Sequence, residues 1–316
     1  MTFCSAGVTE EPNWGRGPVQ VTDLFPLSFG RLNSSPSSPE IAREGQSTLR
    51  TTLHWANTIN GATGKYLIDA ESRELLLASR IGVGHNLEVG VQLPILWRGS
   101  GVMDSFIYDW HQFWGFPQGP RQGTEKDRFD VSGSTQDGSK FDYDSRGVKL
   151  GDLRFSAKKL FSKGTDRLPA LAGELSVRVP TGNTDYSPGG VDILGNAYLS
   201  KKLGAVYLYS GFFSSWYQNK VYNDISYEAF RYGADIGVEC PITKTYSLLF
   251  NISGSSNYTS DIVNFPKYQI YADMGLKYDL SVSSQLEILI RENPAPDTGS
   301  SDFSFLLGLK SRLTII

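Results

Sequence analysis

The segments that link the strands predicted by this sequence alternate strictly between long and short. Alternating apolar and polar residues, the pattern of a strand with two different faces, predict twelve strands. In the clearest of them, every even position from Tyr268 to Leu280 is apolar. The second is expected to contain a bulge near Arg73, where the alternation slips. The predicted strands span residues 48–57, 66–81, 85–96, 148–161, 171–179, 191–201, 206–217, 227–240, 246–253, 267–280, 285–291 and 302–316.

The links that follow odd-numbered strands are long, polar and rich in Gly, Ser, Asn and Pro. They span residues 58–65, 98–147, 180–190, 218–226, 254–266 and 292–301. The links after even-numbered strands are short, at residues 82–84, 162–168, 202–205, 241–245 and 281–284. Barrels of the bacterial outer membrane have an even strand number, long external loops and short periplasmic turns, whereas a soluble β-sandwich has no reason to sort its loops. The sequence therefore predicts an all-β fold, a transmembrane antiparallel β-barrel of about twelve strands.

Composition excludes several other classes of protein. The 316 residues contain no run near the roughly 18 consecutive apolar residues that a membrane-spanning helix requires. The net charge is −3, with 30 basic and 33 acidic residues interspersed, so no basic stripe indicates a nucleic-acid partner. Two cysteines and three scattered histidines, at positions 54, 85 and 111, have no metal-ligand spacing. We therefore expect no metal and no cofactor.

The chain divides into an N-terminal segment, residues 1–45, and the predicted barrel, residues 46–316. We expect the former to be a periplasmic or plug-like segment, because residues 17–44 are Pro-rich and lack strand periodicity. The start MTFCSAGVTEEPNW has neither the basic beginning nor the apolar core of a signal peptide. An outer-membrane location therefore implies that the leader was removed or that the gene start was assigned too late. Cys4 could also be the remnant of a lipidated terminus.

Aromatic residues mark one end of the predicted strands. Trp55, Trp97 and Trp216 all fall where a strand reaches the long-loop side, which favours an aromatic girdle at a membrane interface over ordinary strand-end packing. The last strand is apolar and ends the chain, as in substrates of the barrel-assembly machinery, although it lacks a terminal aromatic residue. The expected partners are therefore outer-membrane lipid, lipopolysaccharide and that machinery.

The loop at residues 98–147 is too long to be a passive connector. Met103, Phe106, Ile107, Trp110 and Trp114 have helical spacing, so we expect an amphipathic helix over 103–114. Gly115 and Pro117 end it. The following stretch, residues 124–147, is charged and rich in Gly and Ser, and we expect it to be mobile.

The apolar face of this helix could be buried inside the barrel mouth, against other loops or in the outer leaflet. We favour a position over or in the lumen, because Asp104, Asp109, His111 and Arg121 could pair with charged lumen walls. A structural cap with no gating role is the alternative.

Residues 100–123, SGVMDSFIYDWHQFWGFPQGPRQG, resemble the hallmark segment of an uncharacterised family of predicted outer-membrane proteins, domain of unknown function 3187. That hallmark reads Gly-Gly-x-Leu-Asp-x-Phe-Ile-Glu-x-Phe-His-x-x-Phe-Gly-Leu-Pro…Arg. The matching positions are Asp104, Phe106, Ile107, His111, Phe113 or Trp114, Gly115, Pro117 and Arg121, while Asp69 and Glu71 fall where the family carries an acidic pair. Tyr108 and Ser100 depart from it. The resemblance spans residues 18–316 and implies a location and a fold but no reaction, because the family has no established activity.

A lipid hydrolase is the enzyme class that deserves a test. Barrel phospholipases and lipid A deacylases carry a His-x-Ser-Asn arrangement, in which the Ser attacks after the His takes its proton. This chain has His54-Trp55-Ala56-Asn57, with Ala56 in the place of the nucleophile. A hydrolase would therefore need another serine beside His54, and Ser79 on the second strand is the conceivable one.

The alternation along the strands predicts which charged residues face the lumen, and these include nearly equal numbers of acidic and basic residues. The sequence therefore does not indicate a strongly ion-selective pore. The candidate lumen and loop residues are Asp69, Glu71, Asp104, His111, Arg121, Glu174, Arg178, Arg231, Asp235 and Glu239. We expect a narrow, partly occluded channel or small-solute transporter, in which the 100–147 loop limits entry. A non-conducting structural or surface-binding barrel is the alternative, and a lipid-modifying enzyme comes third.

Overall fold

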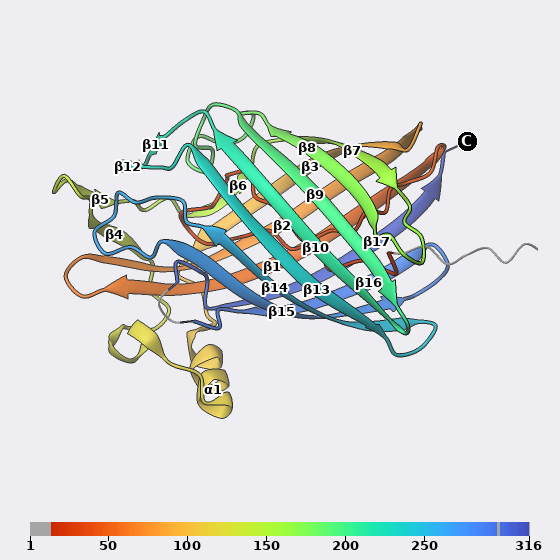
Figure 1. Cartoon of the computed structure of the whole chain (residues 1–316). Coiled ribbons are helices and arrows are strands. Elements are labelled where there is room, and N and C mark those ends of the chain that lie inside the picture. Colours follow the sequence, from red (N-terminus) through yellow and green to blue (C-terminus); the bar gives the residue numbers. More distant parts are fainter. Residues whose placement is uncertain (1–13, 296–297, 316) are drawn as a thin grey trace, which may run out of the picture.

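Twelve antiparallel strands form a closed barrel in the computed structural model, which describes residues 14–295 and 298–315. The first strand pairs with both the second and the last, which closes the sheet (Figure 1). The barrel strands are β1 (Gln46–Ala62), β2 (Tyr66–Gly84), β3 (Leu87–Gly99), β7 (Arg154–Ser162), β8 (Ala170–Arg178), β9 (Asp192–Leu203), β10 (Val206–Tyr217), β13 (Phe230–Pro241), β14 (Tyr246–Ser256), β15 (Tyr268–Asp279), β16 (Ser284–Glu292) and β17 (Phe303–Thr314). The predicted twelve-strand barrel is confirmed.

The two faces of the barrel wall differ in polarity. Leu53 of β1 and Leu307 of β17 face outward and are exposed, whereas Lys277 of β15 and Glu287 of β16 face inward and are buried. An exposed apolar exterior around a charged interior is the arrangement of a barrel that lies in lipid. In the described part of the chain, no helix has both the length and the apolar character needed to cross a membrane.

The strands differ from their predicted bounds mainly at the long-loop end. The stretch 58–65, expected to be a loop, is mostly strand, because β1 and β2 continue to a turn at residues 63–65. Their register runs without a break through Arg73, opposite Trp55, so the predicted bulge there is wrong; the register shifts instead between Gly82 and Gly84. The predicted strand 148–161 is divided into β6 (Gly147–Leu150) and β7.

The described part of the N-terminal segment, residues 14–45, runs inside the barrel (Figure 1, red). Near the short turns, the backbone N–H of Arg16 donates to Glu239 Oε2 at 2.9 Å. The segment then turns at Phe25–Arg31 near the long loops and returns to β1 at Glu40, whose carboxylate pairs with Lys310 at 3.2 Å. Cys4 lies outside the described residues.

The loop between β3 and β7 contains two parts in different places. It forms α1 (Asp104–Trp114), a short helix η1 (Gly119–Gly123) and a hairpin of β4 (Asp130–Ser134) and β5 (Lys140–Asp142). The stretch expected to be mobile thus includes a hairpin, in which β4 pairs with the projecting end of β2. Helix α1 is present as predicted but lies outside the barrel (Figure 1). A second small hairpin is formed by β11 (Val221–Tyr222) and β12 (Ile225–Ser226).

Candidate functional site

The long-loop end of the lumen is closed by the tip of the N-terminal segment. Phe25 and Leu27 of the tip are fully buried in an apolar cluster. The cluster combines strand ends with loop residues, namely Tyr66, Ile68, Ala70, Phe129, Val131, Phe141, Tyr143, Tyr217, Ile225, Tyr227, Tyr258 and Ile262. The 127–146 part of the long loop therefore covers the mouth, whereas the sequence had favoured α1 for that position.

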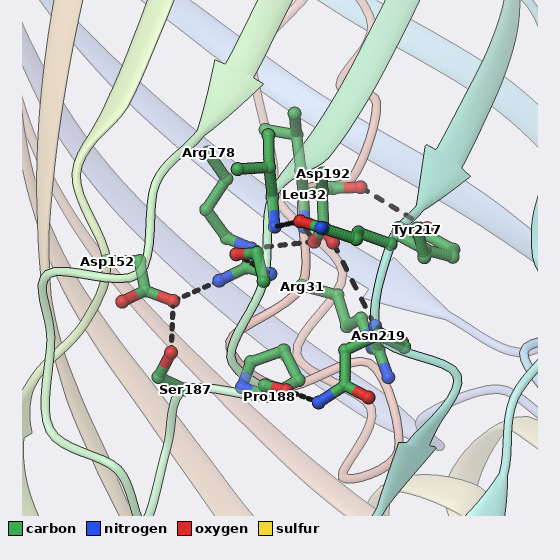
Figure 2. A network of polar contacts seen from close by, with 12 residues as sticks. Arg31, Leu32, Asp152, Arg178, Ser187, Pro188, Asp192, Tyr217 and Asn219 are labelled. Carbon is green, nitrogen blue, oxygen red and sulfur yellow. Dashed lines mark hydrogen bonds and ion pairs between the residues drawn. The ribbon is translucent and has the colours of Figure 1, made fainter.

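A network of buried charges ties this tip to the wall of β8 and β9 (Figure 2). Arg178 Nε donates to Asp192 Oδ2 at 2.6 Å, and the same guanidinium pairs with Asp152. Asp192 Oδ2 also accepts the backbone N–H of Leu32 at 3.0 Å. Arg31 lies 3.9 Å from Asp192 and donates to the Asn219 carbonyl at 2.8 Å. Because both Arg31 and Leu32 belong to the N-terminal segment, one aspartate joins segment and barrel.

Further polar contacts line the path of the segment through the lumen. Thr22 Oγ1 donates to Glu74 Oε1 at 2.6 Å, and Ser34 Oγ donates to Asn196 Oδ1 at 2.7 Å. Lys158 Nζ donates to the Ser38 carbonyl at 2.5 Å. Water can replace each partner, so the neutral bond of Ser34 has a net worth of only about 0.5–1.5 kcal/mol, and the two bonds that involve a charged group about 1.5–3 kcal/mol each.

Free space in the lumen is unevenly distributed along the axis. Two cavities beside the segment, one at Thr22 and one at Asp23, measure about 50 Å³ each, which is space for a few water molecules. At the short-turn end, a cavity of about 540 Å³ opens between the segment and the wall. Its lining is predominantly basic and includes Arg50, Arg80, Lys158, Lys277, Lys310 and Arg312.

Five of the residues singled out from sequence face the lumen as expected: Glu174, Arg178, Arg231, Asp235 and Glu239. Arg80 Nη1 donates to Glu174 at 2.9 Å, and Arg231 Nη2 donates to Gln269 Oε1 at 2.6 Å. Sequence analysis missed Arg31 and Asp192. No periodic pattern marks the first of these, because it lies in an irregular segment.

The other five, Asp69, Glu71, Asp104, His111 and Arg121, come together in one place, but on the outside of the wall. Asp69 and Glu71 share their strand face with the outward Leu75 and Leu77. They are nevertheless buried, because the start of the long loop covers them. The expectation that Asp104, His111 and Arg121 pair with the lumen walls is therefore wrong.

Arg121 is the centre of this external cluster. Its guanidinium pairs with Asp104 and donates to Asp302 Oδ2 and Asn57 Oδ1, each at 2.8 Å. The amide of Asn57 in turn donates to Asp104 Oδ1 at 3.1 Å. Both terminal nitrogens of the buried Arg121 therefore have charged or polar partners, whereas its Nε has none. The cluster thus fixes η1 and the start of α1 to the ends of β1 and β17.

Glu71 joins the helix to the aromatic girdle. Its carboxylate accepts the indole N–H of Trp55 at 2.6 Å, the guanidinium of Arg73 at 2.8 Å and the backbone N–H of Val102 at 2.6 Å. Gly101 has a φ of +76°, and a Cβ there would lie 1.8 Å from the Glu71 side chain. Only glycine therefore fits the approach of the loop to this carboxylate.

His111 makes the attachment of α1 dependent on pH. Burial alone would lower the pKa of His111, but the nearby Glu292 and Asp302 outweigh it and raise the pKa. The imidazole Nε2 lies 3.7 Å from Glu292 Oε2, and Nδ1 contacts the Pro117 carbonyl at 3.0 Å. Because the pKa of His111 is higher in the folded state than in the unfolded state, protonation of His111 stabilises the docked helix. This stabilisation is complete at pH values below the unfolded-state pKa, near 6.5, and is lost as the pH rises through the folded-state pKa.

We therefore expect hydrogen exchange at the amides of α1 to accelerate as the pH rises above 7, after correction for the intrinsic pH dependence of exchange. Burial raises the pKa of Asp302 only to about 6, so Asp302 is largely titrated before this window. A His111→Gln variant should show a flat corrected profile. An identical slope in the variant would show that His111 does not control the docking of the helix.

His54 and Ser79 do not form the catalytic pair that the hydrolase hypothesis considered. His54 faces the lumen and neither ring nitrogen has a hydrogen-bond partner. Ser79 pairs with Leu49 and therefore faces outward, on the opposite side of the wall. Asn57 also faces outward, where it contacts Asp104. Among the described residues, no group of three or more His, Cys, Asp or Glu side chains has the arrangement of a metal site.

Comparison with known proteins gives one strong match and several distant ones. A family described as "Protein of unknown function (DUF3187)" matches residues 1–313, and no curated protein matches the chain. The NanC porin is similar in structure with a TM-score of 0.49 at 9% identity, covering 84% of this chain and 100% of that one. The translocator domain of the autotransporter NalP from Neisseria meningitidis has a TM-score of 0.46 at 9% identity, covering 85% and 88%. The KdgM porin has a TM-score of 0.42 at 8% identity, covering 84% and 98%.

Proposed function

The chain belongs to the DUF3187 family, and we propose that it is an outer-membrane barrel that conducts small polar solutes and is closed at rest by its own N-terminal segment. The observation that carries this proposal is the course of residues 14–45 through the lumen, bound to the wall at both ends. The apolar exterior and the sorting of short turns from long loops support the membrane location, with the short turns in the periplasm.

A channel is favoured over a permanently filled barrel by the kind of contact that the segment makes. Side chains of the wall fill the interior of small eight-stranded barrels, whereas here a separate segment occupies a wider twelve-stranded one. Below its apolar tip, the segment is held by individual hydrogen bonds such as Ser34 to Asn196. The basic cavity of about 540 Å³ already opens the periplasmic half. A shift of the segment would extend this cavity along the axis.

A reversible covalent lock on the segment tests the proposal. Ser34 of the segment and Asn196 of the wall are in hydrogen-bond contact, so we expect Ser34→Cys and Asn196→Cys to form a disulfide on oxidation in a Cys4→Ser, Cys240→Ser background. We expect single-channel openings in planar bilayers from the reduced protein and none from the oxidised protein. Dithiothreitol should restore the openings.

The two single-cysteine variants, oxidised in the same way, are the controls and should conduct throughout. Equal conductance before and after oxidation would show that the segment does not gate the pore. If the reduced, oxidised and control proteins all show no channel openings, although a heat-dependent shift in gel mobility confirms that they are folded, the non-conducting alternative is favoured.

A further inference from the structure

Helix α1 carries an aromatic stripe that the described chain covers only in part. Phe106, Trp110, Phe113 and Trp114 lie at positions i, i+4, i+7 and i+8 and so share one face. Successive rings are in contact, with centroids 6.2 Å apart for Phe106 and Trp110 and 5.7 Å apart for Trp110 and Trp114. Phe113 is 78% exposed and Trp114 is 56% exposed, which is unusual for such large apolar side chains.

The side of the helix next to this stripe is already used. Asp104, Ile107 and His111 are buried against the ends of the barrel strands. Ser105, Asp109 and Gln112 form an exposed polar side. The helix therefore has a docked side, a polar side and a free aromatic stripe, and its orientation is fixed by the Arg121 cluster.

The stripe is continuous with the apolar exterior of the barrel. Phe106 and Trp110 pack edge-on against Phe303, with centroids 5.6 Å and 5.9 Å away. Phe303 begins the outward face of β17, and the next outward residues are the exposed Phe305 and Leu307.

The level of the helix along the barrel is marked by a row of cross-strand neighbours. Trp97, Arg73, Trp55 and Phe305 are paired in this order across β3, β2, β1 and β17. Arg73 lies over both indole rings, 4.0 Å from the centroid of Trp97 and 4.2 Å from that of Trp55. Amphipathic aromatic rings with a cation between them are typical of the boundary between acyl chains and headgroups. Phe303, and with it α1, lies one outward residue beyond this row.

We propose that α1 lies in the surface of the outer leaflet, with its aromatic stripe among the lipids and its polar side towards water. The loop between β3 and β7 thus anchors the barrel to the membrane beside the β1–β17 seam. A helix with one apolar face and one polar face binds a membrane interface in this way. The inference rests on the proposed outer-membrane location, and lipid is the occupant because the stripe extends the lipid-facing surface without a break.

Quenching by brominated lipids tests this placement at single residues. In the Cys4→Ser, Cys240→Ser background, Phe113→Cys carries an environment-sensitive fluorophore on the stripe, and Gln112→Cys carries it on the polar side. Leu307→Cys reports the lipid-facing wall. Each full-length protein is reconstituted in dioleoylphosphatidylcholine vesicles with or without bromine on the acyl chains. We expect several-fold stronger quenching at position 113 than at 112, and strong quenching at 307.

The other outcomes separate the two proposals. Quenching at 307 with none at 113 would place the barrel in the membrane and leave α1 in water, which overturns the anchor alone. Absence of quenching at all three positions would overturn the membrane location itself. Equal quenching at 112 and 113 would contradict the fixed orientation. A blue-shifted signal at 113 that resists bromine and grows with protein concentration would assign the stripe to a second copy of the chain.

Discussion

Replacing Arg178 with Ala should lower the free energy of unfolding by about 3–5 kcal/mol, the usual cost of removing one partner from a buried charge network. The Arg178 side chain is fully buried, and so are its partners Asp152 and Asp192. Without the guanidinium, two carboxylates remain inside the wall with too few donors. The loss should also weaken the hold on the N-terminal segment, because Asp192 binds Leu32 and Arg31.

Urea-induced unfolding in detergent micelles, followed by tryptophan fluorescence, measures this effect. Arg167→Ala is the matched control, since Arg167 lies exposed in the link between β7 and β8 and should change stability by less than about 0.5 kcal/mol. Adding Asp152→Asn to the Arg178 variant removes one of the two stranded charges and should recover part of the loss. A cost near that of the control would mean that the network is hydrated and contributes little.

The barrel could be predicted from sequence because its determinants are local. Alternation along Tyr268–Leu280 fixes which side chains of β15 face out, and the same kind of alternation along β8 placed Glu174 and Arg178 correctly in the lumen. Link lengths identified the two ends of the barrel without any knowledge of contacts. These signals depend only on residues close together in sequence, so one sequence is enough to detect them.

The external cluster was misplaced for two reasons. Asp104, His111 and Arg121 were assigned to the lumen from their charge alone, and the predicted bulge concealed the outward parity of Asp69 and Glu71. A bulge near Arg73 would have changed the parity between the two halves of β2, whereas the strand is regular there. With continuous parity, Glu71 shares the outward face of Leu75, where an acidic residue is tolerated only because the loop covers it. Burial of an outward carboxylate by a distant loop leaves no mark on the alternation of β2 itself.

The course of the N-terminal segment was also beyond local patterns. Its contacts connect residues far apart in sequence, such as Arg16 with Glu239 and with Asp279, 2.7 Å from its guanidinium. The polar and proline-rich composition was compatible with a periplasmic segment as well as with a plug. The choice between them depends on the width of the lumen, which the strand number sets and the segment does not.

Deleting residues 17–41 should raise single-channel conductance at least about tenfold, because the lumen of a twelve-stranded barrel is wider than its own side chains can fill. The deletion removes Phe25 and Leu27 from the mouth and the contacts that Leu32 and Ser34 make with the wall. It keeps Ala42, whose N–H donates to Glu88 at 2.6 Å, and so preserves the entry into β1.

Deletion of residues 100–147 is the informative comparison. The loop hairpin covers the tip, but Arg31 and Leu32 hold the segment through Asp192 of β9 and Asn219 in the loop after β10, so this deletion alone should raise conductance much less. Planar-bilayer recordings of both variants show which deletion raises conductance more, and heat-dependent gel mobility checks that both variants are folded. If the loop deletion conducts as well as the segment deletion, the loop is the main barrier and the N-terminal segment merely lines an open pore. If a folded segment deletion stays silent, wall side chains collapse into the vacated lumen, and the barrel is not a channel.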